Sequence, residues 1–156
     1  MGSLDPKELL IRAQTAAFRL LKVRQRSEAE IRERLARKNF PPEIVEGTLS
    51  FLRTHSFVDD AAFTRWWIKS RLNKPFGLTR IRLELRQKGV SEDILREELA
   101  LAAEDLDEAA LISVVIKKRL GRYQGLEPLK RKKRLFDFLA RRGFSVEAIQ
   151  KAIRKI

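Results

Sequence analysis

Apolar residues recur every three or four positions along most of this chain, which is the spacing of one face of an α-helix. Three stretches that begin at Ile31, Ile81 and Leu135 share this pattern so closely that they align without a gap. The pattern therefore predicts one helical unit, repeated at intervals of about fifty residues. The coinciding apolar columns are Ile31/Ile81/Leu135, Leu35/Leu85/Leu139, Phe40/Val90/Phe144, Val45/Leu95/Ile149 and Leu49/Leu99/Ile153.

A conformational hinge occurs at the same offset in each copy. The hinge residues are Asn39, Gly89 and Gly143, and asparagine and glycine are the residue types that enter the left-handed backbone region at least cost. Each copy is thus predicted to be a helix, a left-handed stop and a second helix. Such pairs are typical of helical repeat arrays, whose units bury their faces against their neighbours.

A further helix is predicted before each pair. The first runs from about Pro6 to Val23, and the others begin near Asp59 or Asp60 and at Asp107. No segment alternates with a period of two, so no sheet is expected. We predict an all-α fold, an elongated, curved tandem array of three three-helix repeats with about nine helices. The repeats are placed at residues 1–55, 56–104 and 105–156.

Local signals refine the helix starts. Ser27 with Glu30 forms a capping box, and Thr79 and Ser145 are predicted N-caps. The helix that follows Asp107 has apolar residues on two sides, Val114 among them, which predicts packing on two sides.

Composition is that of a folded protein, with 44% hydrophobic residues and no cysteine. No apolar run approaches the roughly 18 residues of a membrane span, and the N-terminal MGSLDPKELL lacks an apolar signal core. We therefore expect a cytoplasmic protein that does not engage a membrane.

Charge is the strongest bulk property. The chain has 34 Lys and Arg against 21 Asp and Glu, a formal net charge of +13. Such an excess favours a polyanionic partner, either nucleic acid or an acidic protein surface. An acidic block from Ser91 to Glu108 separates two basic regions, so one uniform DNA-wrapping surface is not expected.

No constellation for catalysis is visible in the sequence. His55 is the only histidine, and neither a G-x-x-x-x-G-K-(S/T) loop nor a G-x-G-x-x-G turn occurs. Asp59 and Asp60 fit a helix start better than a metal site. We identify no catalytic residue, no cofactor-binding residue and no metal ligand, and we expect a protein that is not an enzyme. Trp66 and Trp67 fit either the core or a base-stacking face, and their spacing with Phe63 places at least one in the core.

Basic residues gather in three clusters, which are the best candidates for contact with an anionic partner. Their spacing contains no base-reading pattern, so the interpretation is limited to phosphate or acidic-protein contact. The first cluster is Arg24, Arg26, Arg32, Arg37 and Lys38, the second is Lys69, Arg71, Lys74, Arg80 and Arg82, and the third is Lys130, Arg131, Lys132, Lys133 and Arg134.

Several ordered motifs extend over nearly the whole chain. They are L-x-x-R-x-R-S-x-x-E-(L/I)-x-x-x-L, then (F/L)-(I/V)-D-D, then G-x-x-x-I-x-x-E-L-x-x-K-G. Their residues are Leu21, Arg24, Arg26, Ser27, Glu30, Ile31 and Leu35, then Phe57, Val58, Asp59 and Asp60, then Gly77, Ile81, Glu84, Leu85, Lys88 and Gly89. Together with the closing ARRGFSVEAI they resemble the bacterial RecX proteins. The chain departs from that pattern at Asn39, where glycine is usual, and at Trp66–Trp67, where smaller or single aromatic residues are commoner.

The resemblance implies a regulator of the RecA recombinase in recombination and the SOS response. Such proteins are built from tandem three-helix repeats, bind within the groove of the RecA–DNA filament, and restrain its ATPase and strand exchange without an enzyme activity of their own. On this basis we expect the RecA filament as partner, DNA as a possible sequence-independent contact in single- or double-stranded form, no cofactor, and a monomer. The alternative is a helical repeat protein that binds DNA directly and has no recombinase partner.

Overall fold

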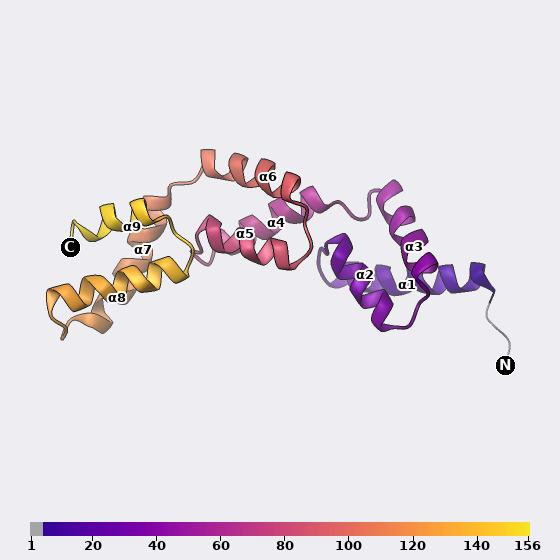
Figure 1. The fold of residues 1–156 in the computed structure, drawn as a ribbon, viewed down its shortest axis with the longest axis horizontal. Helices are drawn as coiled ribbons and strands as arrows, with labels where there is room; N and C mark the ends of the chain where they lie inside the picture. Colours follow the sequence, from indigo (N-terminus) through magenta and orange to yellow (C-terminus); the bar gives the residue numbers. More distant parts are fainter. Residues whose placement is uncertain (1–4) are drawn as a thin grey trace. The chain divides into compact units, whose positions relative to one another are not determined.

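The computed structural model describes residues 5–156, so the first four residues of the N-terminal segment considered above lie outside it. Within these residues the chain forms nine α-helices, one short 3₁₀ helix and no strand (Figure 1). The predicted all-α class, with three helices in each repeat, is confirmed for this part of the chain. The helices are α1 Pro6–Val23, α2 Glu28–Arg37, α3 Pro42–Thr54, α4 Asp60–Leu72, α5 Leu78–Gln87, α6 Glu92–Glu104, α7 Glu108–Leu120, η1 Gly121–Tyr123, α8 Pro128–Arg141 and α9 Val146–Ile153.

The chain divides into two compact units. The first comprises the described residues up to Trp66 together with Leu85–Leu95, and the second comprises Trp67–Glu84 together with Arg96–Ile156. The middle repeat, α4 to α6, therefore contributes residues to both units. The repeat boundaries after residues 55 and 104 stay a prediction.

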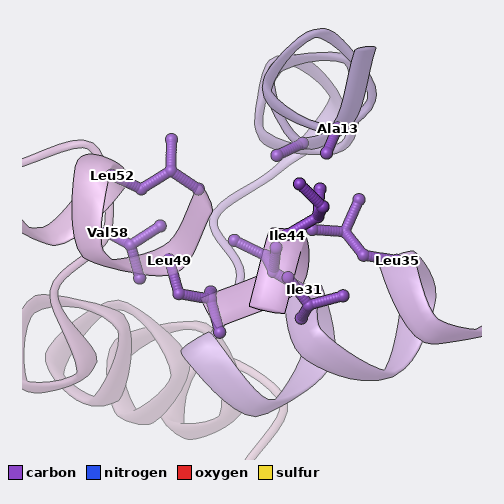
Figure 2. Packing of buried hydrophobic residues seen from close by; sticks show 9 residues of the cluster. Ala13, Ile31, Leu35, Ile44, Leu49, Leu52 and Val58 are labelled. Carbon is purple, nitrogen blue, oxygen red and sulfur yellow. The ribbon is translucent and has the colours of Figure 1, made fainter. Parts of the chain in front are cut away.

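Apolar side chains from α1, α2 and α3 form the core of the first unit. Ala13 and Ala17 are fully buried on α1, and their small side chains let the other helices approach α1 closely. Each large side chain that is buried here contributes roughly 1.5–3 kcal/mol relative to exposure. The buried members are Ala13, Ala17, Ile31, Leu35, Ile44, Val45, Leu49, Leu52 and Val58 (Figure 2).

The core of the second unit is built from α7, α8 and α9 around Phe144. The prediction that α7 packs on two apolar sides is wrong at Val114, which is 44% exposed. The helix instead turns one apolar face to its own pair of helices. The buried members of this core are Ile112, Val115, Ile116, Leu135, Leu139, Phe144, Ile149 and Ile153.

The predicted apolar columns form the cores. Every residue of the columns that begin with Ile31, Leu35, Val45 and Leu49 is buried in all three copies. In the remaining column Phe40 is only half-buried, whereas its counterparts Val90 and Phe144 are buried. Helical periodicity thus identifies the inward face of each pair.

The predicted left-handed stops are confirmed at all three hinges. Asn39 has φ 63°, Gly89 has φ 75° and Gly143 has φ 85°. A fourth positive φ, 57° at Ser56, was not predicted. Ser56 follows the end of α3, and its N–H donates to the Arg53 carbonyl at 3.1 Å, which closes that helix as a hinge would.

The helix starts agree with the predicted caps, with one exception. The Ser27 hydroxyl accepts from the Glu30 N–H at 3.2 Å, and the Glu30 carboxylate accepts from the Ser27 N–H at 3.2 Å, which completes the capping box. Ser145 accepts from the Ala148 N–H at 3.3 Å. The prediction that Thr79 is an N-cap is wrong, because α5 begins at Leu78 and the Thr79 N–H donates to the Gly143 carbonyl. In residues 5–156 no helix has the length and apolar character needed to cross a membrane.

Candidate interface for an anionic partner

The first basic cluster is largely paired with carboxylates of its own unit. Arg24 bonds Glu30 at 2.7 Å, Arg32 bonds Glu46 at 2.7 Å, and Arg37 bonds Glu33 at 2.5 Å. The last two pairs are exposed, and exposed pairs contribute at most about 1 kcal/mol and exchange readily for another anion. Lys38 is exposed and forms no ion pair with residues 5–156.

Arg26 differs from its neighbours in the first cluster. It is half-buried, and its Nε is buried without a hydrogen-bond partner among the described residues. Burial lowers the pKa of Arg26, and the adjacent Arg24 guanidinium lowers it further. A buried donor without a partner is costly, so an incoming acceptor at Arg26 would be favourable.

The start of α2 meets the hinge that follows α5 within the first unit. The Ser27 hydroxyl donates to the Lys88 carbonyl at 2.6 Å, and Lys88 Nζ bonds Glu30 at 2.9 Å. Burial raises the pKa of Glu30, but hydrogen bonds from Arg24, Lys88 and the Ser27 N–H outweigh burial and lower that pKa to about 2. Arg24 and Lys88 therefore share one ionised carboxylate, that of Glu30.

Two arginines of the second basic cluster lie against Phe76 in the link between α4 and α5: Arg71 is 4.6 Å and Arg80 4.8 Å from the centre of the ring. Arg71 and Arg80 bond Glu84, and Trp67 Nε1 donates to the same carboxylate at 3.0 Å. Burial raises the pKa of Glu84, but the bonds from Arg71, Trp67 and Arg80 outweigh burial and lower that pKa.

Two lysines of the second cluster differ from its arginines. Lys69 and Lys74 are exposed, and neither forms an ion pair with residues 5–156. Arg82 is half-buried.

The third basic cluster lies in the first two turns of α8. Lys130, Lys133 and Arg134 are exposed, and none of the cluster forms an ion pair with the described residues. Arg131 donates to the Leu126 carbonyl at 3.2 Å, while its Nε is buried without a partner. The first turn of α8 contains no acid. Cations at a helix N-terminus oppose the helix dipole, so this cluster does not serve helix stability.

A fourth group of cations was not predicted. Arg142 lies at 4.8 Å from the centre of the Phe76 ring and 5.0 Å from that of Phe138, and Arg119 lies at 3.8 Å from the Phe138 ring. The basic stretch from Lys117 to Arg122 and the pair Arg141–Arg142 beside the hinge are visible in the sequence. Only the fold brings them together.

The other sequence candidates have structural roles. Asp59 accepts from the Ala61 N–H at 2.9 Å and so caps α4, while Asp60 accepts from the Glu28 N–H at 2.9 Å. His55 lies against the Phe51 ring. Trp66 and Trp67 are both half-buried. No group of metal-ligating side chains occurs in residues 5–156.

Fold and surface together define a tandem three-helix repeat protein with strongly basic clusters. Comparison with protein families gives a match for each repeat: the first three-helix domain of RecX over residues 13–52, the second over residues 59–99 and the third over residues 106–153. The chain belongs to the RecX family.

Relatives and solved structures agree with this assignment. The regulatory protein RecX of Thermobifida fusca is 34% identical over 99% of this chain and 83% of its own length. That of Prosthecochloris aestuarii is 36% identical over 100% of this chain and 98% of its own length. A crystal structure of regulatory protein RecX superposes with a TM-score of 0.84 at 24% identity over 99% of this chain and 80% of that one. RecX from Lactobacillus salivarius superposes with a TM-score of 0.84 at 19% identity over 96% of this chain and 97% of that one. The two structures support the fold.

Proposed function

We propose that this protein regulates the RecA recombinase and has no enzyme activity of its own. It binds the groove of the RecA–DNA filament and restrains ATP hydrolysis and strand exchange in recombinational DNA repair and the SOS response. The observation that carries this proposal is the match of three consecutive RecX domains, which together extend from residue 13 to residue 153. It acts as a monomer in the cytoplasm.

The charge distribution supports an anionic nucleoprotein as partner. A net charge of +13 exceeds what solubility requires, and the basic clusters lie on separate repeats. Several weak contacts that are linked by one chain multiply into a strong one, so no single cluster needs high affinity. A repeat array of this kind suits bridging between adjacent RecA subunits.

We propose that the cations without internal carboxylates make the main contacts. A carboxylate already bound to an arginine must be displaced before that arginine meets a new anion, whereas an unpaired cation has no such cost. The members of the three predicted clusters that fit this description are Arg26, Lys38, Lys69, Lys74, Lys130, Arg131, Lys132, Lys133 and Arg134.

The DNA-stimulated ATPase of RecA tests the proposed function. RecA with single-stranded DNA and ATP is titrated with the protein, and a gel shift on the same DNA without RecA runs in parallel. We expect ATP hydrolysis to fall at protein concentrations that do not yet shift the bare strand. Unchanged hydrolysis across a titration that saturates the bare strand would defeat the proposal.

A second candidate function is direct DNA binding without a recombinase partner. The third cluster favours it, because its cations form no ion pair with residues 5–156. A steep dependence of bare-DNA affinity on salt, with no effect on the RecA ATPase, would select this alternative.

A further inference from the structure

A basic groove lies within the second unit, where the end of α7 with η1, the C-terminal end of α8 and the link between α4 and α5 meet. Its volume is about 410 Å³, and no acidic residue lines it. Only Lys74 of these cations belongs to the clusters predicted from the sequence. The cations that line it are Lys74, Lys118, Arg119, Arg122 and Arg142.

The cations of the groove have no carboxylate partner. None of the five forms an ion pair with residues 5–156. Arg142 instead donates to the backbone carbonyls of Lys74 at 2.9 Å and Pro75 at 3.3 Å. Burial lowers the pKa of Arg142, and the nearby Arg119 and Arg80 guanidinium groups lower it further. The groove therefore concentrates positive charge without compensation from within the unit.

Two guanidinium groups of the groove are held in place by an aromatic ring. Arg119 and Arg142 lie 3.8 Å and 5.0 Å from the centre of the Phe138 ring. Contacts of this kind reduce the side-chain entropy that a ligand would otherwise have to remove, and they leave N–H groups free to donate. The groove is thus prepared for an anion before any anion binds.

The junction in the first unit can be compared with the equivalent junction beside the groove in the second unit. In the aligned copies Glu30 corresponds to Arg80, and Lys88 corresponds to Arg142. At the junction in the first unit Lys88 bonds Glu30 at 2.9 Å. At the equivalent junction in the second unit the acid is replaced by Arg80, so Arg142 faces a cation. Packing of the repeats does not require this change, because the first junction forms with the charges paired.

We propose that this groove binds the phosphodiester backbone of a nucleic-acid strand. Phosphate oxygens accept the paired N–H groups of a guanidinium with good geometry, and the groove offers three such groups. Nucleic-acid interfaces are rich in positive charge, whereas the centres of protein–protein interfaces are depleted in charged residues. The groove resembles a nucleic-acid interface, since its centre is charged. This inference rests on the proposed function, and it adds a site at which the protein contacts DNA directly.

Fluorescence anisotropy of a labelled oligothymidylate, titrated with the full-length protein, tests the groove. The double variant Lys118→Glu and Arg122→Glu reverses two exposed cations whose side chains form no hydrogen bond and no ion pair with the described residues. Its matched control is Lys117→Glu and Lys155→Glu, the same change of charge in the same unit but outside the groove. The single variant Lys74→Glu probes the opposite wall, and circular dichroism confirms that each variant is folded.

We expect the groove variant to bind on the order of tenfold more weakly than the control, and the slope of log affinity against log salt to decrease by about 1.4. Lys74→Glu is expected to weaken binding in the same direction. Equal weakening by the groove and control variants, or no weakening by the groove variant, would overturn the proposal. So would competition by polyglutamate as effective as that by unlabelled oligonucleotide, which would indicate an acidic protein instead. ATP hydrolysis by RecA is measured separately in the presence of the wild-type protein. If hydrolysis does not change, the proposed function is wrong, but the anisotropy result still stands.

Discussion

Single residues at the repeat junctions set how closely the repeats approach. The Gly77 N–H donates to the Arg142 carbonyl at 2.8 Å, in the position where Ser27 bonds the Lys88 carbonyl in the first unit. The two junctions thus use the same contact with different donors, a hydroxyl in one and a backbone N–H in the other. The junction in the second unit leaves no room for a side chain on Gly77, which supplies the donor.

Gly77→Ala should destabilise the second unit by about 2–4 kcal/mol. A Cβ on Gly77 would lie 2.1 Å from the Gly143 carbonyl oxygen and 2.4 Å from the Phe144 nitrogen, so backbone would have to move. Urea unfolding measures the loss. Gly125→Ala is the control, because a Cβ there meets nothing within 4 Å. Equal stability of the two variants would contradict the close approach of Gly77 to the backbone of Gly143 and Phe144.

Glu30 should make stability depend on pH. Its pKa falls from 4.5 to about 2 in the folded protein, so its contribution is present above pH 4.5 and is lost as pH falls through about 2. A shift of this size corresponds to at most about 3 kcal/mol, and solvent screening at this partly exposed site reduces the contribution.

Thermal unfolding between pH 7 and pH 3 measures this contribution as the difference between the wild type and Glu30→Gln. We expect the difference to be largest at pH 5–7 and to shrink below pH 4.5. The matched control is Glu33→Gln, whose exposed pair with Arg37 should contribute less than about 0.5 kcal/mol. A difference that is constant across this range would show that Glu30 is not held ionised by Arg24 and Lys88.

At the scale of elements, the recurring part is a helix, a left-handed hinge and a second helix. The buried columns of α2 and α3 reappear in α8 and α9, and each set packs against its own preceding helix, α1 or α7. Local signals are enough to build this pair, which explains why hinges and columns were predictable. The first and the third pair each complete a core with their own leading helix.

Leu139→Ala should destabilise the protein by about 2–5 kcal/mol, because Leu139 is fully buried in the core of the second unit. Leu129→Ala, at a position that is 82% exposed on the same helix, should change stability by less than about 0.5 kcal/mol. Hydrogen exchange should show the loss of protection mainly in α7, α8 and α9. Equal loss of protection in α1–α3 would mean that the two cores unfold as one.

The sequence predicted most features that depend on near neighbours, the left-handed turn at Ser56 excepted, and missed those that depend on residues far apart in the chain. Ile31, Leu35 and their counterparts follow from helical spacing, and the capping box at Ser27 follows from residues three apart. The contact of Gly77 with Gly143 joins residues from different repeats, and no local pattern contains it. The convergence of Arg119 and Arg142 on Phe138 was missed for the same reason.

Across the whole molecule, the two units differ in how far their cations are paired with carboxylates. In the first unit carboxylates such as Glu30 and Glu46 neutralise neighbouring arginines. In the second unit the cations of α8 and of the groove have no such partner in residues 5–156. We therefore expect contact with an anionic partner to depend more on the second unit than on the first.

Binding of the protein to a preformed RecA filament tests whether it recognises RecA itself and not DNA alone. RecA is assembled on an immobilised single strand with a slowly hydrolysed ATP analogue, and binding of the protein is compared with binding to the same strand without RecA. We expect tighter binding to the filament, with a smaller salt dependence than on the bare strand, because protein contacts add to phosphate contacts. Equal or weaker affinity for the filament would contradict this expectation.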